Sequence, residues 1–578
     1  MKKLFLIALA LSGSVSVAAQ KADPKGPSRT VQGSPRTVEG PRRTAEAARG
    51  TDDSVTALLT AIYHGDAQAV DRLIAAGANV RAANREGVTP LALACLDGDL
   101  PIIARLLAAG ADPKERGPNG ETLLMLAARN GRVDVIRRLL DAGADVNARE
   151  ALRGTTALMW AAEQRHPEAV KALLAAGADP SVVSGPAGLP QNYMAPRVNV
   201  SAVQEARQRR ARAVAAGRTY DEQVAFERRN PVAGSGSPTG QPAAPAAAAD
   251  DDTVVQAGLV GNGGGGLTAL VFASREGDIE SARALLDGGA RINQTTEYGW
   301  TPLLTAVNNR NYALAKLLID RGADVNLANK GGWTPLYLAT DNRNIEGGDY
   351  PVPQPDLDHL DIIRALLQHG ANPNARVRDN TLTRTIFTMQ WFFEDGATAF
   401  VRAAQSSDTE LMKLLLEYHA DPFMATANGD TALTAAGGIG WVEGVTYERS
   451  PQENVEAIRM LLDLRLDPNA ANNEGRTALM GAALKGRNAA VQLLVERGAK
   501  LETYDRGSRD TDKIGSAAAG HTWQALDYAE GLVRVGVQSA TAYPETAALI
   551  RRLMKERGLP VPPENRNILS ICVVAICQ

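Results

Sequence analysis

Short blocks of apolar residues alternate with polar ones along most of the chain, and residues 301–326 show the pattern most clearly. Thr301 and Pro302 suit the start of a helix, because a threonine hydroxyl can accept a bond from a free backbone N–H and proline lacks a donor there. Apolar residues at helical spacing follow, and then a polar stretch interrupts them. A second apolar face spans Ala313–Arg321, and Gly322 can close that helix in the left-handed conformation. The pattern therefore predicts two short helices joined by a turn, a unit too small to bury its own apolar face.

This unit recurs along the chain. A threonine followed by Pro, Ala or Leu and then an apolar residue returns at intervals of 33 or 34 residues within long blocks. A glycine followed by alanine, as at Gly77 and Gly322, closes most second helices in step with it. The threonines are Thr56, Thr89, Thr122, Thr156, Thr268, Thr301, Thr334, Thr398, Thr431 and Thr477, with a weaker copy around Gln524.

A 33-residue period that carries both signals resembles the ankyrin repeat. The resemblance covers most of Thr51–Gly558 and implies a mostly α-helical solenoid. About eleven helix–turn–helix units would stack in it, joined by short β-hairpin or loop fingers. The histidine that the family usually places after Thr-Pro-Leu is absent, and residues such as Ala92, Met125 and Tyr337 stand in its place. Stacking is expected here without the hydrogen bonds of that histidine.

Two long stretches lack the period. Residues 20–50 and 184–266 are rich in Pro, Gly, Ala, Ser and Arg, which is typical of disordered linkers. The second stretch separates repeats one to four, in 51–183, from repeats five to eleven, in 267–558, and we expect it to leave the stack on the finger side. Its basic cluster Arg207–Arg212 is interpreted as a solvated excursion, with contact to phosphate or an acidic protein surface as the alternative.

Shorter insertions are of two kinds. Asn342–Asp358 and Gly437–Gln452 lengthen the turn between the two helices of a unit, whereas Val377–Glu394 and Glu502–Gly520 lengthen fingers. The two kinds should emerge from opposite ends of the helices. Residues 559–578 form a Pro-rich and apolar C-terminal tail, which we expect to dock on the final helices or to pair as a strand. Uptake of this tail by a partner is the alternative.

The N-terminus has the pattern of an export signal. Lys2 and Lys3 precede the apolar run Leu4–Leu11, and small residues lead to a cleavage site before Gln20. Residues 1–19 are therefore predicted to be a signal peptide, because the run is too short to span a bilayer. We expect a bacterial protein that is periplasmic or secreted, for which nucleic acid is not an expected partner. We expect no integral membrane span, and contact of the protein with a membrane surface is kept as an alternative.

The sequence contains no motif that would bring a nucleophile and a base, or a set of ligand-binding groups, together. The formal net charge of −3 does not favour general polyanion binding. The motifs G-x-S-x-G, H-E-x-x-H and G-x-x-x-x-G-K-[ST] are absent, and the six histidines are dispersed. No catalytic, cofactor-binding or metal-binding residue is assigned, and no cofactor is expected. Cys95 is interpreted as a small buried hydrophobe. Cys572 and Cys577 form either a local disulfide or free thiols, two alternatives of equal weight.

The chain is therefore interpreted as a non-enzymatic scaffold that binds a partner protein on the concave helix and finger surface. Two tryptophans that precede the threonines of neighbouring units form either a binding hot spot or packing contacts between fingers. An aromatic run in one finger insertion either folds back over the stack or is offered to a partner. The alternatives are an envelope-surface protein that uses the basic segments and an enzyme built from inserted loops. The candidate partner-binding residues are Trp300, Trp333, Tyr337, Trp391, Phe392 and Phe393.

Overall fold

The chain divides into two compact units, Met1–Asp53 and Ser54–Gln578. The first unit lies outside the residues that the structure describes, and so does the predicted signal peptide. The computed structural model describes residues 55–186, 190–192, 259–261, 265–345, 354–378, 395–441, 446–447, 449–506, 522–533 and 541–564, with single positions at 212, 216, 223 and 226.

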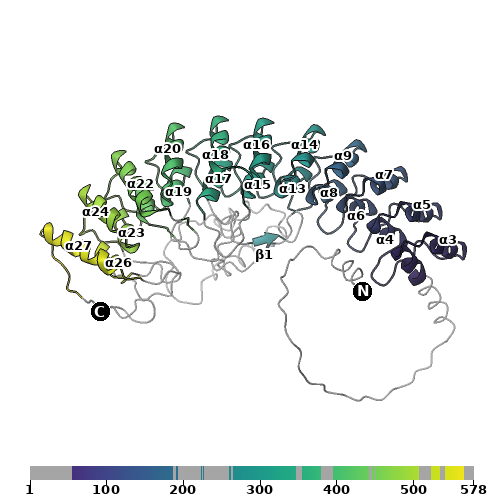
Figure 1. Cartoon of the computed structure of the whole chain (residues 1–578), viewed down its shortest axis with the longest axis horizontal. Coiled ribbons are helices and arrows are strands. Elements are labelled where there is room, and N and C mark those ends of the chain that lie inside the picture. Colours follow the sequence, from purple (N-terminus) through teal and green to yellow (C-terminus); the bar gives the residue numbers. More distant parts are fainter. Residues whose placement is uncertain are drawn as a thin grey trace, which may run out of the picture. The chain divides into compact units, whose positions relative to one another are not determined.

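The described helices of the second unit pair into eleven repeats, numbered here in chain order, and they form one curved stack (Figure 1). The first helices lie along its inner side and are residues 55–63, α4 (Pro90–Asp97), α6 (Leu123–Arg129), α8 (Ala157–Glu163), α13 (Ala269–Glu276), α15 (Pro302–Asn308), α17 (Pro335–Arg343), α19 (Ala399–Gln405), α21 (Ala432–Gly437), α23 (Ala478–Leu484) and α26 (Ala525–Ala529). The second helices are α3 (Ala67–Ala75), α5 (Leu100–Ala108), α7 (Val133–Asp141), α9 (Pro167–Ala175), α14 (Ile279–Asp287), α16 (Tyr312–Asp320), α18 (His359–Gln368), α20 (Thr409–Glu417), α22 (Pro451–Asp463), α24 (Asn488–Glu496) and α27 (Pro544–Glu556). The predicted fold class is confirmed.

Local signals explain where these helices begin and end. From α4 to α23, each first helix follows a threonine whose hydroxyl accepts a bond from the backbone N–H three residues on, as Thr301 does from Leu304 at 3.0 Å. Gly322 closes α16 with a φ of 84°, as expected. In units eight and nine, His419 and Arg465 take the place of this glycine with φ of 65° and 72°. The ends of α20 and α22 are therefore not marked by a glycine in the sequence.

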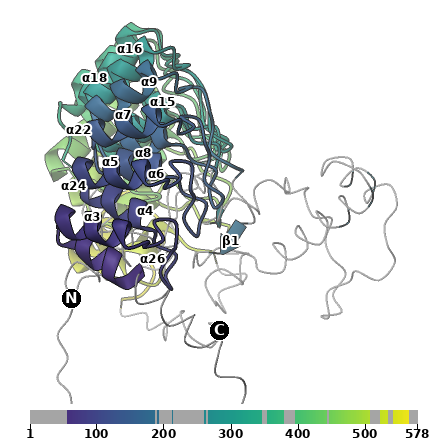
Figure 2. The same ribbon diagram turned by 90° about the vertical axis from the view of Figure 1, so that its right-hand side faces the viewer.

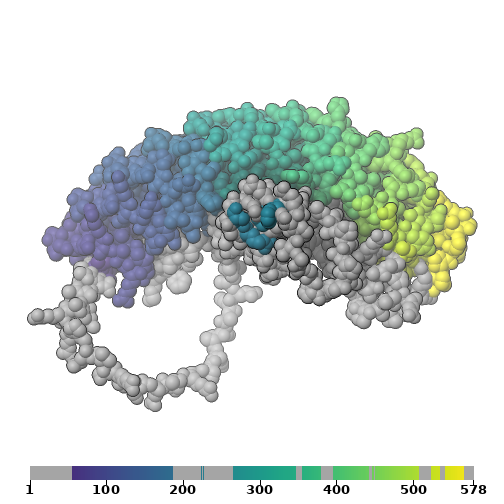
Figure 3. Space-filling view, turned by 180° about the vertical axis from the view of Figure 1, so that it is seen from behind, coloured from purple at the N-terminus to yellow at the C-terminus, as the bar shows by residue number. Residues whose placement is uncertain are grey.

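The stack is continuous across the longest insertion. Helix α8 contacts α13 and α9 contacts α14, although the insertion of residues 184–266 separates them in the chain. Strands β1 (Pro190–Asn192) and β2 (Leu259–Gly261) pair antiparallel within this insertion. At its base, the backbone N–H of Ser184 donates to the carbonyl of Leu267 at 2.8 Å. Figure 3 shows the side chains of the successive units packed into one unbroken surface.

The described ends of two further finger insertions close in the same way. The N–H of Val377 donates to the carbonyl of Ala397 at 3.0 Å, and Tyr504 forms an isolated antiparallel bridge with Gln524. The fingers gather along one edge of the stack (Figure 2). Each described finger base is thus closed by backbone bonds, so a long insertion leaves the stack without interrupting it.

Asparagines link successive units beside the ends of the second helices. Asn326 donates its Nδ2 to the carbonyl of Gly370 at 2.9 Å and accepts from the N–H of Asn372 at 2.7 Å. In unit eight the equivalent residue is Phe423, whose side chain is largely exposed. This unit therefore lacks the asparagine link to unit nine. The equivalent residues that make the same two bonds are Asn147, Asn374 and Asn469.

Candidate functional site: a first-helix stripe and a turn clasp

The first helices place two side chains per unit on a common face, four and seven residues after the capping threonine. In units three to five this face carries Arg129, Trp160, Glu163, Phe272 and Arg275, which we call the first-helix stripe. The guanidinium of Arg129 lies 5.9 Å from the Trp160 ring, and that of Arg275 lies 5.0 Å from the ring of Phe272, which is buried beneath it. Arg275 also pairs with Glu163 at 2.8 Å. The stripe thus crosses the long insertion without a break.

The chemistry of the stripe suits recognition of a protein surface. Trp160 is half-buried, and its indole N–H donates to the hydroxyl of Thr155 at 2.8 Å, which fixes the ring. Burial would lower the pKa of Arg275, but its hydrogen bonds to Glu276 and Glu163 outweigh this effect and raise it. Tryptophan and arginine dominate the binding energy of many protein interfaces. Sequence reasoning missed Trp160, although an aromatic residue at a place that holds leucine in other units was a visible signal.

The structure corrects part of the predicted aromatic surface. Trp333 and Tyr337 are 0% and 1% exposed, and their rings pack edge to face with centroids 4.8 Å apart. The backbone of Trp333 is bonded at both N–H and carbonyl to Asn329, which holds the residue inside the base of its finger. Trp333 and Tyr337 are therefore packing residues, and their prediction as partner contacts is wrong. Trp300 is half-buried and remains a candidate.

Several predicted residues lie outside the part of the chain that the structure describes. They are Trp391, Phe392, Phe393, Cys572, Cys577 and the basic residues Arg207, Arg209 and Arg210. Cys95 is described and is fully buried as a free thiol. Burial, with the nearby charge of Glu115, raises its pKa well above the ordinary value, so the thiol stays protonated. Its prediction as a small buried hydrophobe is confirmed.

The inserted turns of units seven and nine lie at the ends of the helices opposite to the fingers. Their described flanks meet beside unit eight. Helix α17 continues to Arg343, the place where other units turn. Ile345 and Thr446 form an isolated antiparallel bridge, and the N–H of Tyr447 donates to the carbonyl of Asn344 at 3.1 Å. The two turns were predicted as separate insertions. Their described flanks are instead joined by these backbone bonds.

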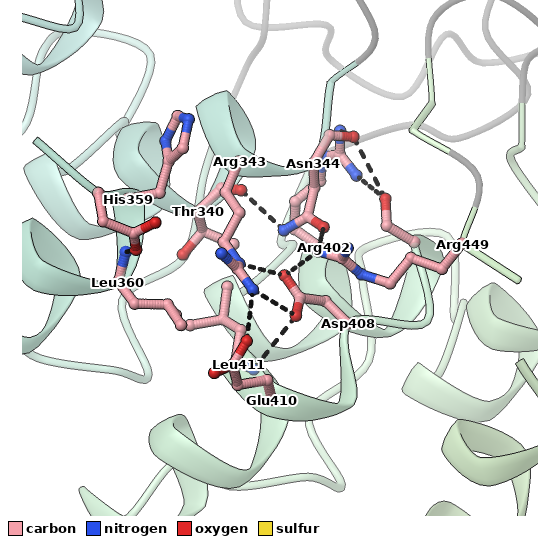
Figure 4. Close-up of polar contacts among 12 residues, drawn as sticks. Thr340, Arg343, Asn344, His359, Leu360, Arg402, Asp408, Glu410, Leu411 and Arg449 are labelled. Atoms are coloured by element: carbon pink, nitrogen blue, oxygen red, sulfur yellow. Dashed lines mark hydrogen bonds and ion pairs between the residues drawn. The ribbon is translucent and has the colours of Figure 1, made fainter. Parts of the chain in front are cut away.

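A buried ionic network holds these flanks (Figure 4). We call Arg343, Asn344, Arg402, Asp408 and Arg449 the turn clasp. Arg343 and Arg449 both pair with Oδ2 of Asp408, at 2.8 and 2.6 Å. Arg402 donates to the carbonyl of Asn344 at 2.7 Å. The Asp408 side chain is only 1% exposed, so these pairs act with little screening by water.

The electrostatics of Asp408 follow from its partners. Burial alone would raise the pKa of its carboxyl group. The hydrogen bond from Arg343 and the charges of Arg449 and Arg343 outweigh burial and hold that pKa below the ordinary value. Arg402 is matched by its own carboxylate, Asp341, at 2.8 Å. The three arginines of the clasp thus face three carboxylates, because Arg343 also pairs with Glu410 at 2.9 Å, and this arrangement fixes the local structure.

The flank that enters α18 is anchored to unit six. Asp356 accepts from the backbone N–H groups of Tyr312 and Ala313, at 2.7 and 3.1 Å, and so caps α16 from another unit. The Tyr312 hydroxyl and Nδ1 of His359 form a hydrogen bond of 2.8 Å. Burial raises the pKa of Tyr312 to about 12, whereas burial and the charges of Arg310 and Arg343 lower that of His359 to about 4. Tyr312 is fully buried, so this neutral pair packs residues at the start of α18 against unit six.

Within the described residues, no group of three or more His, Cys, Asp or Glu side chains is arranged to hold a metal ion. None of the helices in the same ranges is long and apolar enough to cross a membrane.

The stacked helix pairs and their inner stripe define an α-solenoid of the repeat-protein class. Family models described as "Ankyrin repeats (3 copies)" match residues 42–117, 93–184, 246–329 and 270–377, and one described as "Ankyrin repeats (many copies)" matches 449–495. These ranges together cover more than half of the chain, which therefore belongs to the ankyrin repeat family. Ankyrin repeats are generally protein–protein interaction modules. No curated protein matches the chain.

Proposed function

We propose that this protein is a non-enzymatic scaffold that binds a partner protein on its first-helix and finger face. The first-helix stripe is the observation that carries the proposal. It combines a half-buried tryptophan, two arginines and an ion pair on the inner side of one continuous stack. An aromatic ring held by a hydrogen bond can contribute binding energy at a low entropic cost. Trp300, half-buried on the finger between units five and six, is a second candidate contact.

We further propose that the scaffold acts outside the cytoplasm. The support is the basic and apolar pattern of residues 1–19, which is typical of an export signal. An exported ankyrin stack would meet envelope or extracellular proteins, which narrows the search for a partner. Cell fractionation of the full-length chain would check this: recovery of a shortened chain outside the cytoplasm supports export, and a full-length cytoplasmic chain contradicts it.

The binding face can be tested by affinity capture from the envelope of the producing cell. Trp160→Ala combined with Trp300→Ala should weaken capture of a specific protein by about tenfold or more, as hot-spot residues do. The matched control is Arg321→Ala, at the residue that directly follows the outer helix α16 and makes an exposed pair with Asp287. This control should capture the partner as the wild type does.

The outcome that would overturn the proposal is equal capture by both variants at unchanged thermal stability. Salt-sensitive adhesion to anionic vesicles, with no captured protein, would favour the envelope-surface alternative instead. Thermal unfolding of each variant must be measured alongside, because Trp160 also donates a hydrogen bond to Thr155.

A further inference from the structure

At one position of the repeat, an aspartate caps the second helix of its unit. Asp99 in unit two accepts from the N–H of Ile102 at 3.1 Å, and Asp278 in unit five accepts from that of Ser281 at 3.1 Å. Asp408 in unit eight accepts from the N–H of Leu411 at 3.2 Å. All three lie ten residues after the threonine of their unit. The capping role of Asp408 is therefore that of the ordinary repeat.

Asp408 has a second role that this repeat position does not require. Its carboxylate receives Arg343 from the inserted turn of unit seven and Arg449 from that of unit nine. The two arginines come from opposite neighbours, and a single oxygen, Oδ2, lies within 2.8 Å of a nitrogen of each. We propose that Asp408 couples the two inserted turns, so that their described flanks, residues 344–345 and residues 446, 447 and 449, form and open as one element.

Direct bonds between the flanks support this coupling. The carbonyl of Asn344 accepts from the N–H of Tyr447 at 3.1 Å and from Arg402 at 2.7 Å. The side-chain oxygen of Asn344 accepts from Arg449 at 3.3 Å. Asn344 is fully buried, so neither flank can leave without exposing unpaired groups of the other.

The coupled flanks define a surface on the edge opposite to the fingers. Tyr447 exposes 44% of its area there, and the guanidinium of Arg449 lies 5.3 Å from its ring. Because Arg449 is itself fixed on Asp408, the orientation of Tyr447 depends on a carboxylate of another unit. This coupling does not depend on any partner bound to the first-helix stripe.

The test is hydrogen exchange on the folded full chain, read at the amides of Asn344 and Tyr447. Asp408→Asn should accelerate both by about fivefold or more, since coupling energies of this kind correspond to about 5–150-fold. The matched control, Asp99→Asn, makes the same change at the same repeat position in unit two, where the amide oxygen can still cap the helix, and should leave both amides at wild-type rates. Acceleration of one amide alone, or of neither, would overturn the proposal.

Two single-arginine variants provide a second test, which also decides the matter if Asp408→Asn does not fold. Arg343→Gln should accelerate exchange at Tyr447, and Arg449→Gln should accelerate exchange at Asn344, each on the opposite turn. The double variant should lose less protection against hydrogen exchange than the sum of the losses in the two single variants, because both arginines act through Asp408. Strictly additive effects would show that the turns are held independently.

Discussion

Units two to four and units seven to nine use the same repeat in different ways. In the first group the helices of a unit are joined by short turns, where Gly98 and Gly131 adopt positive φ of 73° and 64°. In the second group α17 runs on to Arg343, inserted turns replace the short ones in units seven and nine, and Asp408 in unit eight holds two arginines besides its capping bond. The repeat motif determines where each helix begins. The units on either side determine which side chains a capping carboxylate binds in addition to the helix N-terminus.

The largest expected effect concerns the residue before the threonine. Trp333→Ala in unit seven should lower the free energy of unfolding by about 3–5 kcal/mol, because a fully buried tryptophan leaves a cavity. Val88→Ala, at the same repeat position in unit two, removes a smaller, half-buried side chain and should cost about 1 kcal/mol. Urea unfolding followed by circular dichroism measures both. Similar costs would contradict the assignment of Trp333 as a packing residue.

The next effect concerns the capping aspartates. Asp408→Ala should cost about 3 kcal/mol, because it leaves two arginines without their buried carboxylate. Asp99→Ala should cost about 1 kcal/mol, the value of a helix cap. The free energies of urea unfolding of the two variants provide the comparison. If both changes cost the same, the turn clasp contributes nothing beyond the cap.

The clasp should also make stability depend on pH. The folded pKa of Asp408 lies below its ordinary value, so its contribution is complete above the unfolded pKa and is lost as pH falls through the folded pKa. The difference in free energy of unfolding between wild type and Asp408→Asn should therefore be largest at neutral pH and shrink below about pH 4. A difference that is constant between pH 7 and pH 3 would indicate that the charge is not involved.

The smallest effect concerns the ends of second helices. Gly143 in unit three has a φ of 91°, whereas Arg465 in unit nine adopts a φ of 72° with a side chain attached. Gly143→Ala should cost about 1 kcal/mol, and Arg465→Gly should stabilise by up to about 1 kcal/mol, because only glycine adopts this region without strain. Thermal unfolding midpoints report both changes. A loss of stability in Arg465→Gly would mean that the arginine makes compensating contacts.

Much of the fold could be predicted because its signals are local. A threonine cap, a following proline or alanine and a closing glycine act within a few residues, so Thr301 and Gly322 were placed correctly. The turn clasp could not be predicted, because Arg343 and Asp408 lie 65 residues apart and meet only when the units stack. The burial of a side chain likewise depends on residues that are distant in the sequence. Trp300 and Trp333 occupy equivalent places in the sequence, yet only Trp333 is fully enclosed.

The central claim, that a partner protein binds the first-helix face, is tested most directly by hydrogen exchange of the full chain with and without its captured partner. The account predicts slower exchange in α8, α13 and the fingers beside them, with α14 and α16 unchanged. Slower exchange on α14 and α16, with α8 and α13 unaffected, would contradict it.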